Sequence, residues 1–170
     1  WTVQTIQPGG AKFFVTGSKK ESNFHVVDSE YRGLAALDNV KAIVIAEGYA
    51  TADTLSQALS CPVVAAFDSG NLLKVAQVLQ KKYPQKPIVI AGDDDLTQES
   101  INGKNPGKEK AMEAAQLVNG AVVLPIFAPG EQVSQQLSDF NDLANKSVLG
   151  IEAVKRQVGS VVEKVSQQAK

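Results

Sequence analysis

The fold is decided by two stretches, KAIVIAEGYA at residues 41–50 and KPIVIAGDDD at residues 86–95. Each is a short apolar run that ends in carboxylates, and its continuous apolar character predicts a strand buried on both faces of a parallel sheet. In open α/β sheets, ligands bind outside the carboxyl ends of the strands, where Glu47 and the aspartates at 93–95 would meet. Carboxylates gathered in one place repel one another unless a cation joins them. The pattern therefore favours a divalent metal and a substrate that carries phosphate.

The composition limits the class of protein. A chain of 170 residues, 44% of them hydrophobic, can bury one sizeable core. The single Cys61 excludes a disulfide framework within the chain, and one Cys with one His cannot build a zinc site. There is no signal peptide and no apolar run that could span a bilayer, so we expect a cytoplasmic protein with no membrane partner. The chain begins at Trp1 without an initiator Met, which indicates a fragment of a longer parent protein with other domains.

The net charge of −1 does not predict a basic surface of the kind that nucleic-acid-binding domains usually have. If the chain handles nucleic acid, metal ions must neutralise part of the site, or another domain must supply the grip on the phosphates.

Three segments follow from the pattern of the chain. Residues 1–39 are an N-terminal β-hairpin extension, in which TVQTIQ and FFVTG flank the turn PGGAK and FHVV is a possible third strand. Residues 40–147 alternate between strands and helices, which implies right-handed crossovers and a parallel sheet. Residues 148–170 hold a C-terminal helix at 150–168, whose valine stripe indicates packing. The expected fold is an α/β sandwich with a mostly parallel four-stranded sheet flanked by helices, plus a small antiparallel β unit.

The aspartate triplet is the first candidate site. In an extended segment alternate residues face the same way, so Asp93 and Asp95 would project together while Asp94 points aside. Their oxygens suit Mg²⁺ or Mn²⁺. A solvated acidic turn is the alternative, but the position directly after a buried strand favours a site.

Two other acidic positions would join it. Glu47 could bind metal or act as a general base, and Gly48 after it indicates a sharp turn or close approach to a ligand. Asp139, Asn141 and Asp142 form a later acidic group, which a helix N-cap would explain equally well.

A loop at residues 102–110 carries Lys104, Lys108 and Lys110 at the start of a helix. Cations there oppose the helix dipole, whereas a phosphate would be held by both the lysines and the free N–H groups. A solvated flexible loop is the competing interpretation.

Together these residues resemble the Toprim domain, the metal-dependent catalytic fold of bacterial-type primases, topoisomerases and related nucleases. The resemblance covers residues 40–145 and rests on a strand that ends in Glu47-Gly48, followed by a strand that ends in Asp93-x-Asp95. The strings VIAEGYATADTL, PVVAAFDSGNL, IVIAGDDD, NPGKEKAMEAA and DFNDLA further resemble plasmid- and phage-borne primases, including those linked to conjugative relaxases. In such proteins a stretch similar to residues 1–27 precedes the Toprim part.

The resemblance implies RNA primer synthesis on single-stranded DNA from ribonucleoside triphosphates, by two-metal phosphoryl transfer with Mg²⁺ or Mn²⁺. Glu47 would be the general base or metal-organising residue, and Asp93 and Asp95 would hold metal. Asp139 and Asp142 could complete the metal-binding cluster. The residues expected to bind the nucleotide or its phosphates are Gly48, Asp68, Lys104, Lys108 and Lys110.

The sequence also departs from the family pattern. Cellular replicative primases typically carry an Asp where this chain has Thr51, and neither a zinc-ribbon module nor the basic template-gripping domain is present. We therefore expect the fragment to hold the site with weak activity, or none, on its own. Alternative interpretations are a Toprim nuclease, a topoisomerase fragment, or a degenerate Toprim module that docks DNA or protein partners. A receiver-like signalling module fits less well, because the chain lacks its acidic pair and its strand-end Lys.

Overall fold

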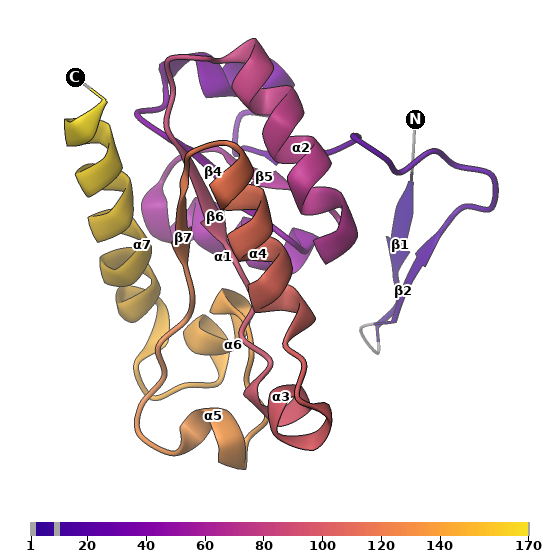
Figure 1. Ribbon diagram of the computed structural model, residues 1–170, viewed down its shortest axis with the longest axis vertical. Coiled ribbons are helices and arrows are strands. Elements are labelled where there is room, and N and C mark those ends of the chain that lie inside the picture. The colour runs from indigo at the N-terminus through magenta and orange to yellow at the C-terminus, as the bar shows by residue number, and fades with distance from the viewer. Residues whose placement is uncertain (1–2, 9–10, 170) are drawn as a thin grey trace.

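A five-stranded sheet forms the centre of the computed structural model, which describes residues 3–8 and 11–169 (Figure 1). Its strand order is β3-β5-β4-β6-β7, and all neighbouring pairs are parallel except β3 with β5. The strands are β3 (His25–Val27), β4 (Ile43–Ala46), β5 (Val63–Ala65), β6 (Ile88–Ala91) and β7 (Ala121–Val123). The α/β class and the mostly parallel sheet are confirmed.

The central pair β4 and β6 shows why the sequence folds this way. Both strands read Ile-Val-Ile-Ala, and every residue in them is buried. They pair in parallel from Ile43 with Ile88 to Ala46 with Ala91, so both strands end at the same level. The residues that follow them are thereby brought side by side at one edge of the sheet.

The sheet has one strand more than the four we expected. The segment FHVV, which we grouped with the N-terminal hairpin, supplies β3 and pairs antiparallel with β5, His25 opposite Ala65. Val26 and Val27 are buried in the cores on opposite faces of the sheet, and β3 covers an edge of β5 that would otherwise be unpaired. The three-residue strand His-Val-Val fits a hairpin or a sheet edge equally well, which is why the sequence did not identify its partner. The division of the chain at residues 39 and 147 stays a prediction.

Helices cover both faces of the sheet, as expected. One core contains buried residues of α1 (Tyr49–Leu59), α6 (Phe140–Asn145) and α7 (Gly150–Gln168), and the other contains those of α2 (Ser69–Lys82), α4 (Pro106–Leu117) and η1 (Gly33–Asn39). Figure 1 shows α7 on one side of the sheet and α2 and α4 on the other. The C-terminal helix has the predicted bounds, and Val154 and Val158 of its valine stripe are fully buried. The short helices α3 (Leu96–Asn102) and α5 (Glu131–Ser134) lie in the loops after β6 and β7.

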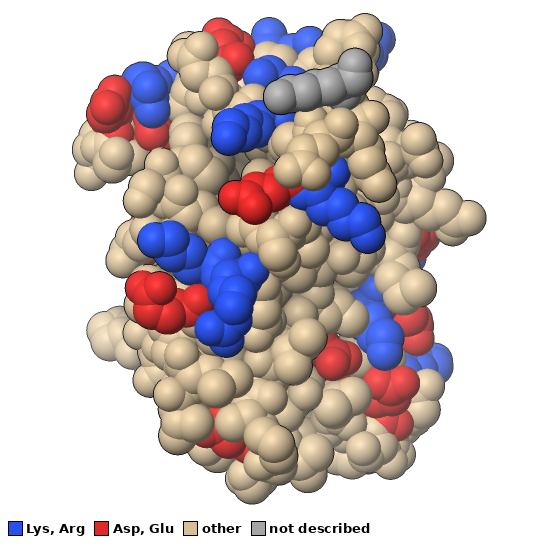
Figure 2. All heavy atoms as spheres, turned by 90° about the vertical axis from the view of Figure 1, so that its left-hand side faces the viewer, with Lys and Arg blue, Asp and Glu red and all other residues tan. Residues whose placement is uncertain are grey.

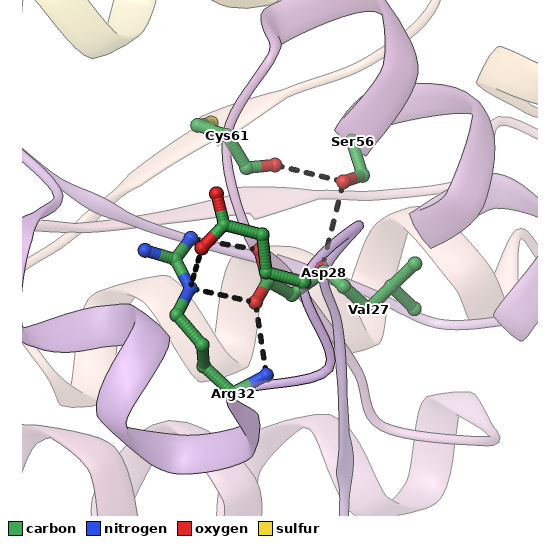
Figure 3. Close-up of polar contacts among 6 residues, drawn as sticks. Val27, Asp28, Arg32, Ser56 and Cys61 are labelled. Carbon is green, nitrogen blue, oxygen red and sulfur yellow. Dashed lines mark hydrogen bonds and ion pairs between the residues drawn. The ribbon is translucent and has the colours of Figure 1, made fainter.

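The junction between β3 and η1 is held by polar contacts (Figure 3). The guanidinium of Arg32 donates to both carboxylate oxygens of Asp28, at 3.0 and 2.9 Å, and these bonds lower the pKa of the Asp28 carboxyl to about 2. The hydroxyl of Ser56 in α1 donates to the carbonyl of Cys61 at 2.9 Å and lies 3.5 Å from the carbonyl oxygen of Val27. The Ser56 contacts link the end of β3 to α1 and to the segment that leads into β5.

The N-terminal hairpin is confirmed as β1 (Gln4–Ile6) and β2 (Lys12–Phe14), which pair antiparallel. Gly9 and Gly10 of the expected turn, like Trp1, lie outside the described residues. The ring of Phe14 packs edge-on against Phe67, which follows β5, with 6.1 Å between the ring centroids. The hairpin is therefore attached at the carboxyl ends of the central strands.

A tight contact at Gly92, between β6 and the aspartates, gives a stability prediction. A Cβ at Gly92 would lie 2.5 Å from the Cβ of Ala111 in α4 and 3.0 Å from a methyl carbon of Leu124. Gly92→Ala is therefore expected to lower the free energy of unfolding by about 1–3 kcal/mol through overpacking, measured by urea denaturation. Gly159→Ala in α7 is the matched control, because its Cβ would meet nothing closer than 3.9 Å. Equal unfolding midpoints for the two variants would contradict this account.

Candidate active site

Five acidic side chains gather where the central strands end. Glu47 follows β4, Asp93 and Asp95 follow β6, and Asp68 caps α2 after β5. Asp139 caps α6, which packs against α1. Because β4 lies between β5 and β6 in the sheet, carboxylates from three neighbouring strand ends face the same edge.

Glu47 lies half-buried at the centre of this group. Burial raises the pKa of its carboxyl, and the negative charges of Asp68 and Asp95 raise it further. The backbone N–H of Ser69, at the start of α2, donates to the carboxylate and opposes the shift. A carboxyl whose pKa is moved towards neutrality is suited to accept and release a proton.

Asp93 is the most perturbed acid of the cluster. Burial raises its pKa to about 8, and the charges of Glu47, Asp139 and Asp95 contribute in that order. Its Oδ1 is buried and has no hydrogen-bond partner among the described residues. The start of α4 presses on it as well, since a Cβ on Gly107 would stand 3.0 Å from the Cβ of Asp93. A buried carboxylate oxygen without a donor is a strong candidate for contact with a cation.

Asp94 points aside, as the alternation of an extended segment predicted. Its Oδ1 accepts from the side-chain amide of Asn105 at 2.8 Å, and its backbone carbonyl accepts from Gln132 at 2.8 Å. Asn105 is buried, caps α4, and also accepts from the backbone N–H of Asp95 at 3.1 Å. These bonds fix the backbone around Asp93 and Asp95. The sequence predicted neither Asn105 nor Gln132, because amides in short polar segments give no distinctive pattern.

Asp139 has two roles at once. Its Oδ1 accepts from the backbone N–H of Asp142 at 2.7 Å, which confirms the helix N-cap, and its Oδ2 accepts from the hydroxyl of Thr51 at 3.1 Å. Burial raises the pKa of Asp139, and the charge of Asp142 raises it further. Thr51 thus positions a neighbouring acid and adds no charge of its own. Asp142 itself is engaged with Lys146 at 2.7 Å and with the backbone N–H of Ser138 at 3.0 Å.

The three loop lysines form no ion pairs with the acidic group in the described part of the chain. Lys110 pairs with Glu113 along the exposed side of α4, at 2.6 Å, and Lys104 is exposed. Lys108 is half-buried, and no ion pair joins it or Lys104 to an acid in the described part of the chain. Their role in phosphate binding stays a prediction. Asp68 forms an ion pair with Lys20 and accepts from the backbone N–H of Asn71 at 3.1 Å.

Lys12 is a further residue near the acidic group that the sequence did not predict. It lies on β2 of the hairpin, yet its Nζ is 3.4 Å from the point where a Cβ on Gly48 would stand. Its positive charge lowers the pKa of Glu47, Asp93 and Asp139. A lysine on an exposed two-stranded hairpin carries no sequence signal that would connect it to a distant strand end.

The chemistry of these carboxylates fits a hard cation, although their arrangement forms no metal site among the described residues. Within residues 3–8 and 11–169, no three Asp, Glu, His or Cys side chains stand close enough together to hold a metal ion. The half-buried carboxylates nevertheless raise one another's pKa, and Asp93 leaves one oxygen without a partner. Oxygen ligands with surplus negative charge are what Mg²⁺ and Mn²⁺ prefer.

Comparison with known proteins gives a consistent picture. The family model described as the Toprim domain matches residues 42–148. A DNA primase TraC of Escherichia coli is 39% identical over 221 residues, which covers 97% of this chain and 15% of the relative. A second DNA primase TraC of Escherichia coli is 41% identical over 221 residues, which covers 97% of this chain and 20% of the relative. The chain thus spans a fifth or less of these curated relatives, and no solved structure matches it.

Proposed function

Since the chain belongs to the Toprim domain family, we propose that it is the catalytic part of a DNA primase, which joins ribonucleotides on a single-stranded DNA template. The observation that carries the proposal is the half-buried acidic cluster around Asp93, at the edge of the sheet where α/β folds bind their ligands. The primase names of the relatives favour primer synthesis over DNA cleavage within this family.

Glu47 is the proton acceptor in this proposal. It takes the proton of the 3′-hydroxyl as that oxygen attacks the α-phosphorus of the incoming ribonucleoside triphosphate and pyrophosphate leaves. Burial keeps the pKa of Glu47 above its usual range, so the carboxylate is a better base than an exposed glutamate. The Ser69 N–H holds the carboxylate in place at the end of β4.

Asp93 and Asp95 are the residues that would hold Mg²⁺ or Mn²⁺, with Asp139 beside them. A divalent ion at this position would stabilise the negative charge that develops on the phosphate oxygens. Asn105 accepts a hydrogen bond from the backbone of Asp95, and Thr51 donates one to the carboxylate of Asp139, which supports these residues as ligands.

The contacts that hold the DNA template would come from outside this chain. Basic and acidic side chains are interspersed on the face shown in Figure 2, in keeping with the net charge of −1. Such a surface binds DNA phosphates weakly, and the low coverage of the relatives leaves room for other domains to supply this contact.

Among the described residues, no helix has the length and apolar character needed to cross a membrane.

Metal binding is the direct test of the proposal. On titration with Mn²⁺, the backbone NMR signals around Glu47, Asp93 and Asp95 are expected to broaden first. The variants Asp93→Asn and Asp95→Asn should each weaken binding at least about tenfold, since each removes a charged ligand. The matched control is Asp38→Asn, an exposed carboxylate in η1, which should leave the affinity unchanged.

If wild type binds no Mn²⁺, or all three variants respond alike, metal-dependent transfer by this chain is wrong. A Toprim module that docks DNA or protein partners would then be the better account.

A further inference from the structure

Lys12 places a positive charge beside the acidic cluster. Its ammonium lies against Gly48, next to Glu47, and it influences Glu47, Asp93 and Asp139 electrostatically. Within the described part of the chain, no carboxylate oxygen comes within the 4.0 Å of an ion pair with it. The ammonium is therefore close enough to act on the acids, and it makes no hydrogen bond or ion pair with another described residue.

The hairpin is held in this position by specific contacts. Lys12 and Phe14 are two residues apart on β2, so they project from the same face of the strand. Phe14 packs on Phe67, and the ammonium of Lys20 lies 5.2 Å from the centroid of the Phe14 ring while it pairs with Asp68. The inner face of the hairpin is thereby fixed over the ends of β4 and β5.

Gly48 brings this ammonium close to the backbone that follows Glu47. Any side chain there would begin 3.4 Å from the Nζ of Lys12 and would come between the ammonium and the strand end. The result is a place with a cation on one side and carboxylates on the other. A polyphosphate chelated to a divalent ion has the matching arrangement of charge.

We propose that Lys12 binds the phosphate chain of the nucleotide above Gly48, so that the β1–β2 hairpin forms one wall of the active site. This inference rests on the proposed function and adds a binding residue from a segment outside the matched family region, residues 42–148.

The proposal makes two predictions of opposite sign for Lys12→Met, which removes the charge and keeps the length of the side chain. The affinity for ATP in the presence of Mg²⁺ should fall about tenfold or more, because a charge-assisted contact to phosphate is lost. The affinity for Mn²⁺ alone should rise, by about two- to tenfold, because a neighbouring positive charge no longer opposes the cation. Both are measured by titration calorimetry on the 170-residue chain.

Two further variants separate binding from folding. Lys12→Arg keeps the charge and should retain most of the ATP affinity. Lys19→Met, on an exposed side chain of the same segment, should change neither affinity. A merely structural role for Lys12 would weaken Mn²⁺ and ATP together in Lys12→Met.

The outcomes separate the two proposals. If wild type binds Mn²⁺ and ATP but Lys12→Met retains its ATP affinity or loses both affinities, the inference about Lys12 is wrong and the metal site stands. If wild type binds neither Mn²⁺ nor ATP, both the proposed function and the role of Lys12 are overturned.

Discussion

Glu47→Gln is expected to lower primer synthesis by the protein that carries this chain by about 10²–10⁴-fold, the usual contribution of a general base. Glutamine has nearly the same shape and can still accept the Ser69 N–H, so the strand end should keep its structure. It cannot take a proton from an attacking hydroxyl. The loss should therefore appear in the rate of nucleotide joining and leave the fold unchanged.

The measurement is incorporation of labelled ribonucleotide on a single-stranded DNA template, with thermal denaturation as the check on folding. Glu152→Gln in α7 provides the matched control, because Glu152 is exposed and is not one of the five acids of the site. Activity of Glu47→Gln within about threefold of wild type would remove Glu47 from the mechanism.

The parts of the fold and site that the sequence predicted are those set by local pattern. Both Ile-Val-Ile-Ala runs are apolar at every position, so they need a place in the sheet where both faces are buried. This requirement predicted β4 and β6, and with them the positions of Glu47 and Asp93 at the strand ends. The two-residue period of an extended segment predicted that the side chain of Asp94 points away from those of its neighbours, and it does so, towards Asn105. The Asp139 cap likewise follows from the chemistry of the first helical turn.

The parts that the sequence did not predict depend on contacts between distant segments. β3 has its place because β5 offers an open edge, a fact about the assembled sheet that no three-residue run reveals. Lys12 reaches Gly48 because Phe14 is seated on Phe67 after β5. Thr51, which in sequence looks like a lost ligand, instead donates to Asp139. In each case the residue type was visible, and its partner was determined by tertiary packing.

Asp93→Asn is expected to stabilise the metal-free chain above neutral pH. The folded state raises the pKa of Asp93 from 3.8 to about 8, mainly by burial. Between these two values the folded chain keeps a proton that the unfolded chain releases, so the free energy of unfolding falls as pH rises, by about 1.4 kcal/mol per pH unit from this group. This stability is fully present below pH 3.8 and is lost as pH rises through 8. Asparagine does not titrate, so the variant lacks this contribution.

Thermal denaturation in EDTA from pH 5 to 8.5 measures the effect. Each 1 kcal/mol of this difference would place the midpoint of Asp93→Asn about 2–4 °C above that of wild type at the alkaline end. The midpoint of wild type should approach that of the variant towards pH 5. The raised pKa values of Glu47 and Asp139 make the stability of both proteins fall somewhat as the pH rises. Saturating Mn²⁺ should reverse the order at pH 8, because the cation stabilises the ionised Asp93 of wild type and gains less from the amide. Parallel pH profiles for the two proteins would mean that Asp93 is ionised in the folded chain in the absence of a cation. The acidic cluster would then keep its negative charge without a bound metal ion.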